Sequence, residues 1–259
     1  MHVHPPKPLH GWKEFLNEIF VIVIGVLIAL GFEQVVEELH WQHKVHDGEE
    51  RLDNELKAVY RAAILQVVVA PCVNRQFDAL EERVLKSGAT LDPATAIPLS
   101  DRMTWTGAAQ PVILTRHRLM PTGVWATLNA DGTILHMPLR QQRRLGLIYN
   151  FAQTYGEAAT HLDGLSDLSR PVPLDPAVRY LMMERIQATR NAHFAMTNAA
   201  VQIAANLKEM GLAPGVPQTE ADLGQDIAPS LSACKRAGYP LADWQAALAK
   251  QMSLKQVGL

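Results

Sequence analysis

Histidines recur at short spacing on both sides of a long apolar stretch near the N-terminus. His40, His43 and His46 are three residues apart after it, and a second group precedes it, namely His2, His4 and His10. On a helix, two histidines at i and i+3 can share a metal, and imidazole binds zinc, copper and haem iron. Steps of three drift around a helix, so the third imidazole leaves the face of the first. We therefore expect no metal site and no cofactor, with His40 and His43 as the nearest candidates for ligands on an otherwise polar helix.

Two polar residues mark a candidate pocket in the second half of the chain. Thr189 and His193 lie one helical turn apart on an apolar seam, and helical bundles often bind ligands among such inward-facing side chains. The alternative is that a backbone carbonyl or a neighbour satisfies each of them, as is usual for buried polar groups. We expect this second arrangement.

Three arginines, Arg140, Arg143 and Arg144, fall in the first turns of an expected helix. The helix dipole disfavours cations there. The cluster therefore either binds an anion or an acidic partner, or forms a solvated face.

Motifs of the common catalytic and cofactor-binding classes are missing from the sequence. It contains no HExxH, GxSxG, Walker A, GxGxxG or CxxC pattern. We expect that the protein is not an enzyme, although catalytic residues also converge from scattered positions. The formal net charge is -2 and no long basic run occurs, so we expect no nucleic-acid partner.

The sequence has only two cysteines, Cys72 and Cys234. Their spacing fits no zinc or redox motif. In an oxidising compartment two such cysteines are expected to pair, and the bond would tie the C-terminal segment to the first helices. The alternative is a pair of buried thiols that behave as small apolar side chains.

The apolar stretch, Ile19 to Phe32, reads IFVIVIGVLIALGF and has no charged residue. A spanning helix needs about 20 residues, and apolar neighbours extend the stretch to 15–36. Trp12 and Trp41 lie 29 positions apart, roughly 43 Å along a helix, so both rings reach the interfaces of a bilayer. A cleaved signal peptide and a buried core helix are the alternatives. Glu18 directly before the stretch argues against a signal peptide, which carries positive charge there.

Orientation and lateral contacts follow from the same segment. Lys7, Lys13 and the amino terminus precede it, and only Lys44 follows closely, so the positive-inside rule places the N-terminus in the cytoplasm. Gly25 and Ala29 form a small-xxx-small step, which permits close approach of another membrane helix. We expect the lipid bilayer and other membrane or periplasmic proteins as partners, with self-association through Gly25 and Ala29.

The remaining chain reads as helices. A seam from Leu52 to Ala70 stops at Pro71, and a second helix is expected from Cys72 to Lys86. Residues 88 to 121 read as loop with a short strand near Val112 to Leu114, followed by a short helix at Gly123 to Asn129. Two long helices begin after Met137 and at Pro176, the latter with Asp175 as N-cap. Two short helices close the chain, near Pro229 to Ala237 and Leu241 to Gln251.

Two stretches resemble a group of bacterial single-pass membrane proteins to which no activity is attached. The first is Glu18-Ile19 with the following IVIGVLIAL, Ile22 to Leu30. The second is Trp125 to Leu128, then Asp131 to Leu135, then a helix with Arg140 and Tyr149. The resemblance covers about a fifth of the chain and implies an anchored helical domain.

We therefore expect a mainly α fold: a transmembrane helix that continues into an extracytoplasmic antiparallel helical bundle. The expected parts are a cytoplasmic tail at 1–14, the transmembrane helix at 15–36 and a helical domain at 37–259, located in the periplasm of an inner-membrane protein. The expected function is that of a membrane-anchored interaction or scaffold domain, or an accessory subunit of a larger membrane complex. The alternative is a ligand-binding sensory module, and an enzyme comes third.

Overall fold

The computed structural model describes residues 11–93, 119–162, 165, 171–211 and 228–256. These residues are mainly helical, with one long apolar helix at the N-terminus. The long elements are α1 (Trp12–Lys86), α3 (Leu139–Ala159) and α4 (Pro176–Glu209), and the short ones are α2 (Gly123–Ala130), the 3₁₀ helix η1 (Thr133–His136), α5 (Ala228–Arg236), α6 (Trp244–Gln256), β1 (Thr90–Leu91) and β2 (Val172–Pro173). The strand expected near Val112 to Leu114 and most of the tail expected at 1–14 lie outside the described residues.

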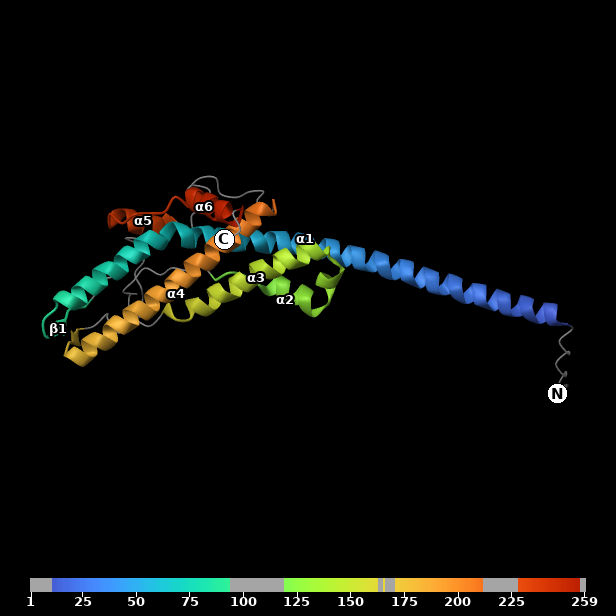
Figure 1. Ribbon diagram of the computed structural model, residues 1–259, viewed down its shortest axis with the longest axis horizontal. Helices are drawn as coiled ribbons and strands as arrows, with labels where there is room; N and C mark the ends of the chain where they lie inside the picture. The colour runs from blue at the N-terminus through green and yellow to red at the C-terminus, as the bar shows by residue number, and fades with distance from the viewer. Residues whose placement is uncertain (1–10, 94–118, 163–164, 166–170, 212–227, 257–259) are drawn as a thin grey trace.

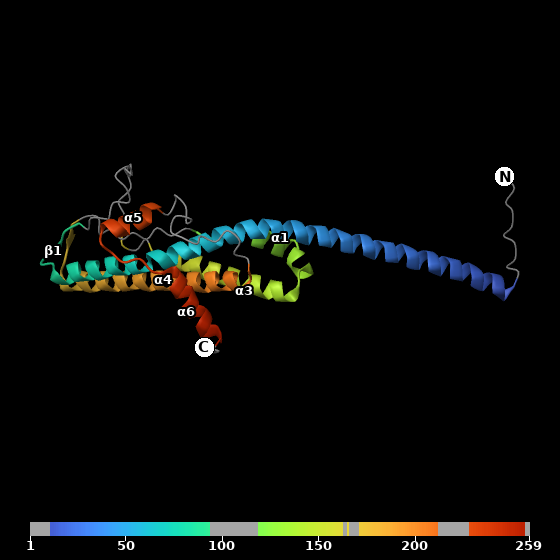
Figure 2. The ribbon, with the colours of Figure 1, turned by 90° about the horizontal axis from the view of Figure 1, so that it is seen from above.

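Helix α1 has two parts with opposite surroundings. Its first part, up to His40, projects from the rest of the molecule and exposes its apolar side chains (Figures 1 and 2). Its second part lies in the core, and Leu52, Leu56 and Val59 are buried. Among the described residues, α1 alone is long and apolar enough to cross a membrane. One continuous helix therefore joins the candidate anchor to the domain.

The predicted break at Pro71 is wrong, because α1 continues through this residue to Lys86. Proline removes one backbone donor and crowds the preceding turn. Here the carbonyl of nearby Val68 accepts a hydrogen bond from the backbone N–H of Ala242, at 2.9 Å. The helix is also buried on every side just before Pro71, from Ala62 to Ala70, and Pro71 itself is half-buried. Tertiary contacts thus support the helix where its own ladder is weakened, and Figure 1 shows it changing direction in its teal part.

The three long helices lie side by side over most of the domain (Figure 1). Polar contacts show the relative directions of the helices. Glu49 of α1 bonds Gln141 of α3, and Glu55 of α1 bonds Tyr149 of α3, so α1 and α3 run parallel. Helices α1 and α4 run antiparallel. Gln66 bonds Thr197, whereas Asp78, which is later in α1, pairs with Arg190, which is earlier in α4. The shared core is filled by large buried side chains, among them Ile64, Phe77, Ile148, Tyr155, Ile186, Met196 and Ile203.

The end of the domain furthest from the apolar segment is closed by α4. Asp175 caps α4, as predicted, and its carboxylate accepts from the N–H of Val178 at 2.8 Å. Arg179 then donates to the carbonyls of Ser87 and Gly88, at 2.8 and 2.9 Å. Carbonyls past the end of a helix lack partners within it, so Arg179 supplies them. Strands β1 and β2 pair antiparallel beside this contact, with Thr90 opposite Pro173.

The C-terminal helices are attached to α1 by a covalent bond. The sulfurs of Cys72 and Cys234 lie 2.04 Å apart, as the sequence predicted, and both residues are fully buried. The bond joins α5 to α1 one residue after Pro71. With the Ala242–Val68 hydrogen bond, it holds α5 and α6 against the curved part of α1.

Candidate functional site

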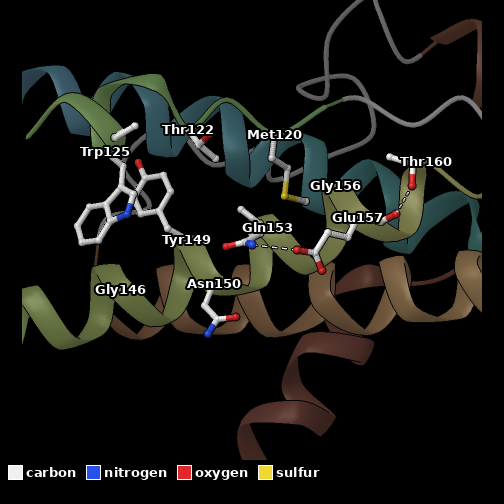
Figure 3. A pocket seen from close by; sticks show the side chains of 12 residues that line it. Met120, Thr122, Trp125, Gly146, Tyr149, Asn150, Gln153, Gly156, Glu157 and Thr160 are labelled. Atoms are coloured by element: carbon white, nitrogen blue, oxygen red, sulfur yellow. Dashed lines mark hydrogen bonds between the residues drawn. The ribbon is translucent and has the colours of Figure 1, made fainter. Parts of the chain in front are cut away.

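A pocket of 680 Å³ lies between α2 and α3. This volume is within the usual range for ligand and side-chain binding pockets. Figure 3 shows the pocket with its aromatic side chains at one end and its polar side chains at the other. The lining residues are Met120, Thr122, Trp125, Ala126, Gly146, Tyr149, Asn150, Ala152, Gln153, Gly156, Glu157 and Thr160.

One face of α3 forms the longest wall of this pocket. Tyr149, Gln153 and Thr160 recur at helical spacing along it, with Gly146 and Gly156 between them. A Cβ added at either glycine would meet nothing within 4 Å. The missing side chains therefore leave open space in the wall, although glycine within a helix costs about 1 kcal/mol.

An aromatic pair forms one end of the pocket. The rings of Trp125 and Tyr149 stack with centroids 4.7 Å apart and planes 7° apart. Trp125 belongs to α2 and Tyr149 to α3, so the stack fixes the width of the pocket at this end (Figure 3).

A buried carboxylate behind this pair holds α1, α2 and α3 together. Glu55 of α1 accepts from the hydroxyl of Tyr149 at 2.6 Å and from the N–H groups of Val124 and Trp125 at 2.8 and 3.2 Å. Those N–H groups open α2, whose N-cap residue makes no side-chain hydrogen bond. Glu55 thus caps α2 from another helix, where a negative charge is favoured by the helix dipole.

The environment of Tyr149 keeps its hydroxyl protonated. Burial, followed by the hydrogen bond to Glu55 and the charge of Glu55, raises the pKa of Tyr149 far above its usual value. A hydroxyl held in this way donates steadily to the carboxylate and is unsuited to proton transfer near neutral pH. The Glu55–Tyr149 pair therefore supports the wall of the pocket.

The chemistry that the pocket offers is recognition by stacking and hydrogen bonding. Met120 and the aromatic pair supply an apolar surface, and Asn150 and Gln153 supply amides. The amide of Gln153 donates to the carboxylate of Glu157 at 2.8 Å, as drawn in Figure 3. Amides and a carboxylate beside an aromatic surface suit a peptide, which has both polar backbone and apolar side chains.

Residues 125–135, which belong to α2 and η1, pack against one side of α1 near its exposed part. Leu128 packs on Gly48, where an added Cβ would lie 3.1 Å from the Leu128 Cδ2 atom. Asp131 accepts from the Thr133 hydroxyl at 2.6 Å and pairs with Lys44 at 3.6 Å. The glycine in α1 and the Asp-Gly turn therefore serve a close helix contact, a role that the sequence alone did not reveal.

Thr189 and His193 are both buried in α4, where they have different surroundings. Thr189 donates to the carbonyl of Arg185 at 2.9 Å and lines a pocket of 400 Å³ between α3 and α4. His193 is instead near α1, with its ring 6.2 Å from that of Phe77. The backbone bond of Thr189 is the arrangement that the sequence favoured.

His40 and His43 lie on the exposed surface of α1. In the ranges that the structure describes, no three histidine, cysteine or acidic side chains gather closely enough to hold a metal ion. Gly25 and Ala29 are exposed on the projecting part of α1, so their predicted role as a contact for another helix stays a prediction.

Glu55 was not among the candidates from sequence. It falls within a helical seam, between Leu52 and Leu56, and single glutamates in helices are usually solvated. The available signal was the position of Glu55 beside two apolar seam residues, which places it at the edge of the buried face.

Comparison with known proteins gave no match: no family model, no curated protein and no solved structure resembles the chain at a significant level.

Proposed function

We propose that the chain is a single-pass protein of the inner membrane whose periplasmic antiparallel helical bundle binds another protein through the pocket between α2 and α3. Residues 15–36 span the bilayer, and α1 carries the domain outside the cytoplasm. The protein thus serves as a scaffold or as an accessory subunit of a membrane complex.

The observation that carries this proposal is the continuity of α1 over 75 residues. The same helix offers exposed apolar side chains in its first part and core side chains in its second. Glu55, which supports the pocket, follows Val36 by 19 residues, roughly 28 Å at 1.5 Å per residue. A helix that is packed into the domain has little freedom to bend, so it would present the pocket at a fixed height above the membrane.

The disulfide supports the extracytoplasmic placement. Cys72 and Cys234 are bonded, and disulfides persist in oxidising compartments such as the periplasm. The lysines before the apolar segment, Lys7 and Lys13, favour the same orientation.

A photo-crosslinking amino acid at Gln153 tests the pocket in intact cells. Gln153 lines the pocket, so a bound protein would give a discrete crosslinked species of higher mass. The matched control position is Arg61, which is exposed on α1. Along α1, Arg61 lies between Glu55 and Gln66, both of which contact α3, so it is at a similar distance from the apolar segment as the pocket.

A second variant separates loss of binding from loss of folding. Gly156→Trp places a ring in the open space of the pocket, where a Cβ meets nothing within 4 Å. We expect the Gln153 crosslink to disappear in this variant while the thermal unfolding curve is kept. A crosslink that forms equally from Arg61, or that survives Gly156→Trp, would count against the pocket as the binding site.

The sensory alternative rests on the same pocket volume, 680 Å³, which also suits a small molecule. It predicts that small solutes from the periplasm raise the melting temperature of the purified protein and that Gly156→Trp removes the increase. A protein partner predicts the crosslink instead, so the two experiments distinguish the classes.

A further inference from the structure

The corner of the domain nearest the projecting part of α1 has a surface on which exposed leucines lie beside exposed arginines. It consists of Leu135 and His136 at the end of η1 and of Leu139, Arg140 and Arg143 at the start of α3, here called the juxtamembrane corner. In Figures 1 and 2 this green part of the domain is the one closest to the blue segment of α1.

The height of the juxtamembrane corner is fixed by an aromatic contact with α1. The ring of His136 stacks on that of Trp41, with centroids 3.8 Å apart and planes 11° apart. Trp41 follows Val36 by five residues, about 7.5 Å of helix. With residues 15–36 in the hydrocarbon, both rings would therefore lie in the headgroup layer, which is about 5–8 Å thick on each side.

Two large leucines of the juxtamembrane corner are open to solvent. Leu135 is 76% exposed and Leu139 is 59% exposed, whereas the neighbouring Ile134 and Met137 are buried. The corner thus places apolar side chains on both sides of a residue that is held beside the interfacial Trp41.

The charges next to these leucines are positive. Arg140 and Arg143 are exposed in the first turns of α3, and that first turn contains no acidic residue. Side chains on a helix lean toward its N-terminus, which for α3 is the end nearest the apolar segment. Of the acidic side chains nearby, Asp131 is paired with Lys44 and Glu49 accepts from the amide of Gln141, so Arg140 and Arg143 are the charged residues of the corner itself.

We propose that the juxtamembrane corner binds the surface of an anionic phospholipid membrane. Leu135 and Leu139 enter the interface, and Arg140 and Arg143 pair with lipid phosphates. This proposal rests on the spanning segment of the proposed function and is independent of the pocket. The contact of the corner with the membrane adds a second point of attachment to that of the spanning segment, so that the domain cannot rotate freely about α1.

Fluorescence quenching on the full chain in vesicles tests this contact. Both native cysteines are in the disulfide, so a polarity-sensitive dye can be attached to one introduced cysteine. We choose Leu135→Cys for the corner and Ile24→Cys for the spanning segment. The control is Leu85→Cys, a leucine that is 63% exposed and lies roughly 70 Å along α1 from Val36.

Nitroxide-labelled lipids supply the readout, with the nitroxide either at the headgroup or deep in the acyl chain. We expect the dye at residue 24 to be quenched by the deep nitroxide, the dye at 135 by the headgroup nitroxide, and the dye at 85 by neither. A quenched dye at 24 with equal signals from 135 and 85 would overturn the corner and leave the span intact. An unquenched dye at 24 would overturn the span and the corner together.

The role of the arginines is tested by lipid composition. Each arginine near an anionic surface favours the bound state by about fivefold. Arg140→Gln with Arg143→Gln should lower the ratio of docked to undocked domain about 25-fold in phosphatidylglycerol vesicles, and Arg61→Gln should not. Equal quenching at 135 in phosphatidylcholine vesicles with and without phosphatidylglycerol would exclude recognition of anionic lipid.

Discussion

Glu55 is the residue on which the contacts between α1 and the wall of the pocket converge. Its side chain lies among Tyr149 and the first N–H groups of α2, and 8% of it is exposed. A buried carboxylate is costly unless donors surround it, and here three donors do. The stability of the junction therefore depends on the charge of this one side chain.

Replacing Glu55 by Gln should lower the free energy of unfolding by about 2–3 kcal/mol, because charge-assisted hydrogen bonds in a buried site weaken together. Denaturant unfolding in detergent, followed by circular dichroism, measures the change. Glu50→Gln is the matched control, since Glu50 is exposed on the same helix five residues earlier. Equal stability of the two variants would show that Glu55 does not hold the junction.

The buried tyrosines predict a loss of stability at alkaline pH. Burial raises the pKa of Tyr60 from 10.0 to about 12 and raises those of Tyr149 and Tyr155 further. In the unfolded chain these groups ionise near pH 10.0. The folded state therefore keeps its full stability below that pH and loses stability above it, because only the unfolded chain gains the ionised form.

The measurement is the free energy of unfolding between pH 9 and pH 12. Above pH 10, each tyrosine that stays protonated only in the folded state lowers the free energy of unfolding by about 1.4 kcal/mol per pH unit. Tyr149→Phe should reduce the slope by this amount. An unchanged slope would mean that Tyr149 ionises as readily in the folded state as in the unfolded chain.

At the scale of the elements, the helices were predicted well where one face repeats. Apolar and small residues recur at steps of four and three from Met182 to Met210, and α4 begins at Pro176 with Asp175 as its N-cap and ends with Met210 as its C-cap. Pro71 was misread because local chemistry favours a break, whereas contacts from a distant segment, Ala242 and Cys234, sustain the helix. The pocket was missed for a similar reason: Glu55 and Tyr149 are 94 residues apart, and no local pattern joins them.

The disulfide predicts how strongly α5 and α6 depend on α1. The two cysteines are separated by 162 positions, and closing a loop of this length stabilises the folded state by up to about 5 kcal/mol in the chain-entropy model. Cys72→Ser with Cys234→Ser should lower the unfolding free energy by a large part of this amount, as measured by denaturant titration.

The control is the effect of a reductant on the two proteins. Dithiothreitol should destabilise the native sequence toward the level of the double variant and should leave the double variant unchanged. If reduction left the native sequence as stable as before, the bond would contribute nothing to holding the C-terminal helices.

The projecting part of α1 predicts lateral association within the membrane. Gly25 and Ala29 lie one turn apart on this exposed segment, and small residues permit close packing of membrane helices. Replacing both by Leu should reduce crosslinked dimers in membranes severalfold. The control, Ile24→Leu with Ile28→Leu, should leave the dimers in place, and equal loss in both variants would argue against a small-residue contact.

At the scale of the whole molecule, α1 determines the arrangement of every other part. Its first part is exposed and apolar, its middle contacts α2 and η1 at Gly48, and its last part contacts α4 (Figure 2). This order places the juxtamembrane corner, the pocket and the disulfide at increasing distances from the apolar segment. The partners that the domain can meet therefore depend on which side of the membrane this series of features faces.

The most direct test is a pair of reporters fused after Leu259 in a Gram-negative host. One reporter is active only in the cytoplasm and the other only in the periplasm. We expect the cytoplasmic reporter to be silent and the periplasmic one to be active, with both fusions remaining in the membrane fraction after alkaline extraction. An active cytoplasmic reporter, or release of the protein by extraction, would contradict the anchored periplasmic domain.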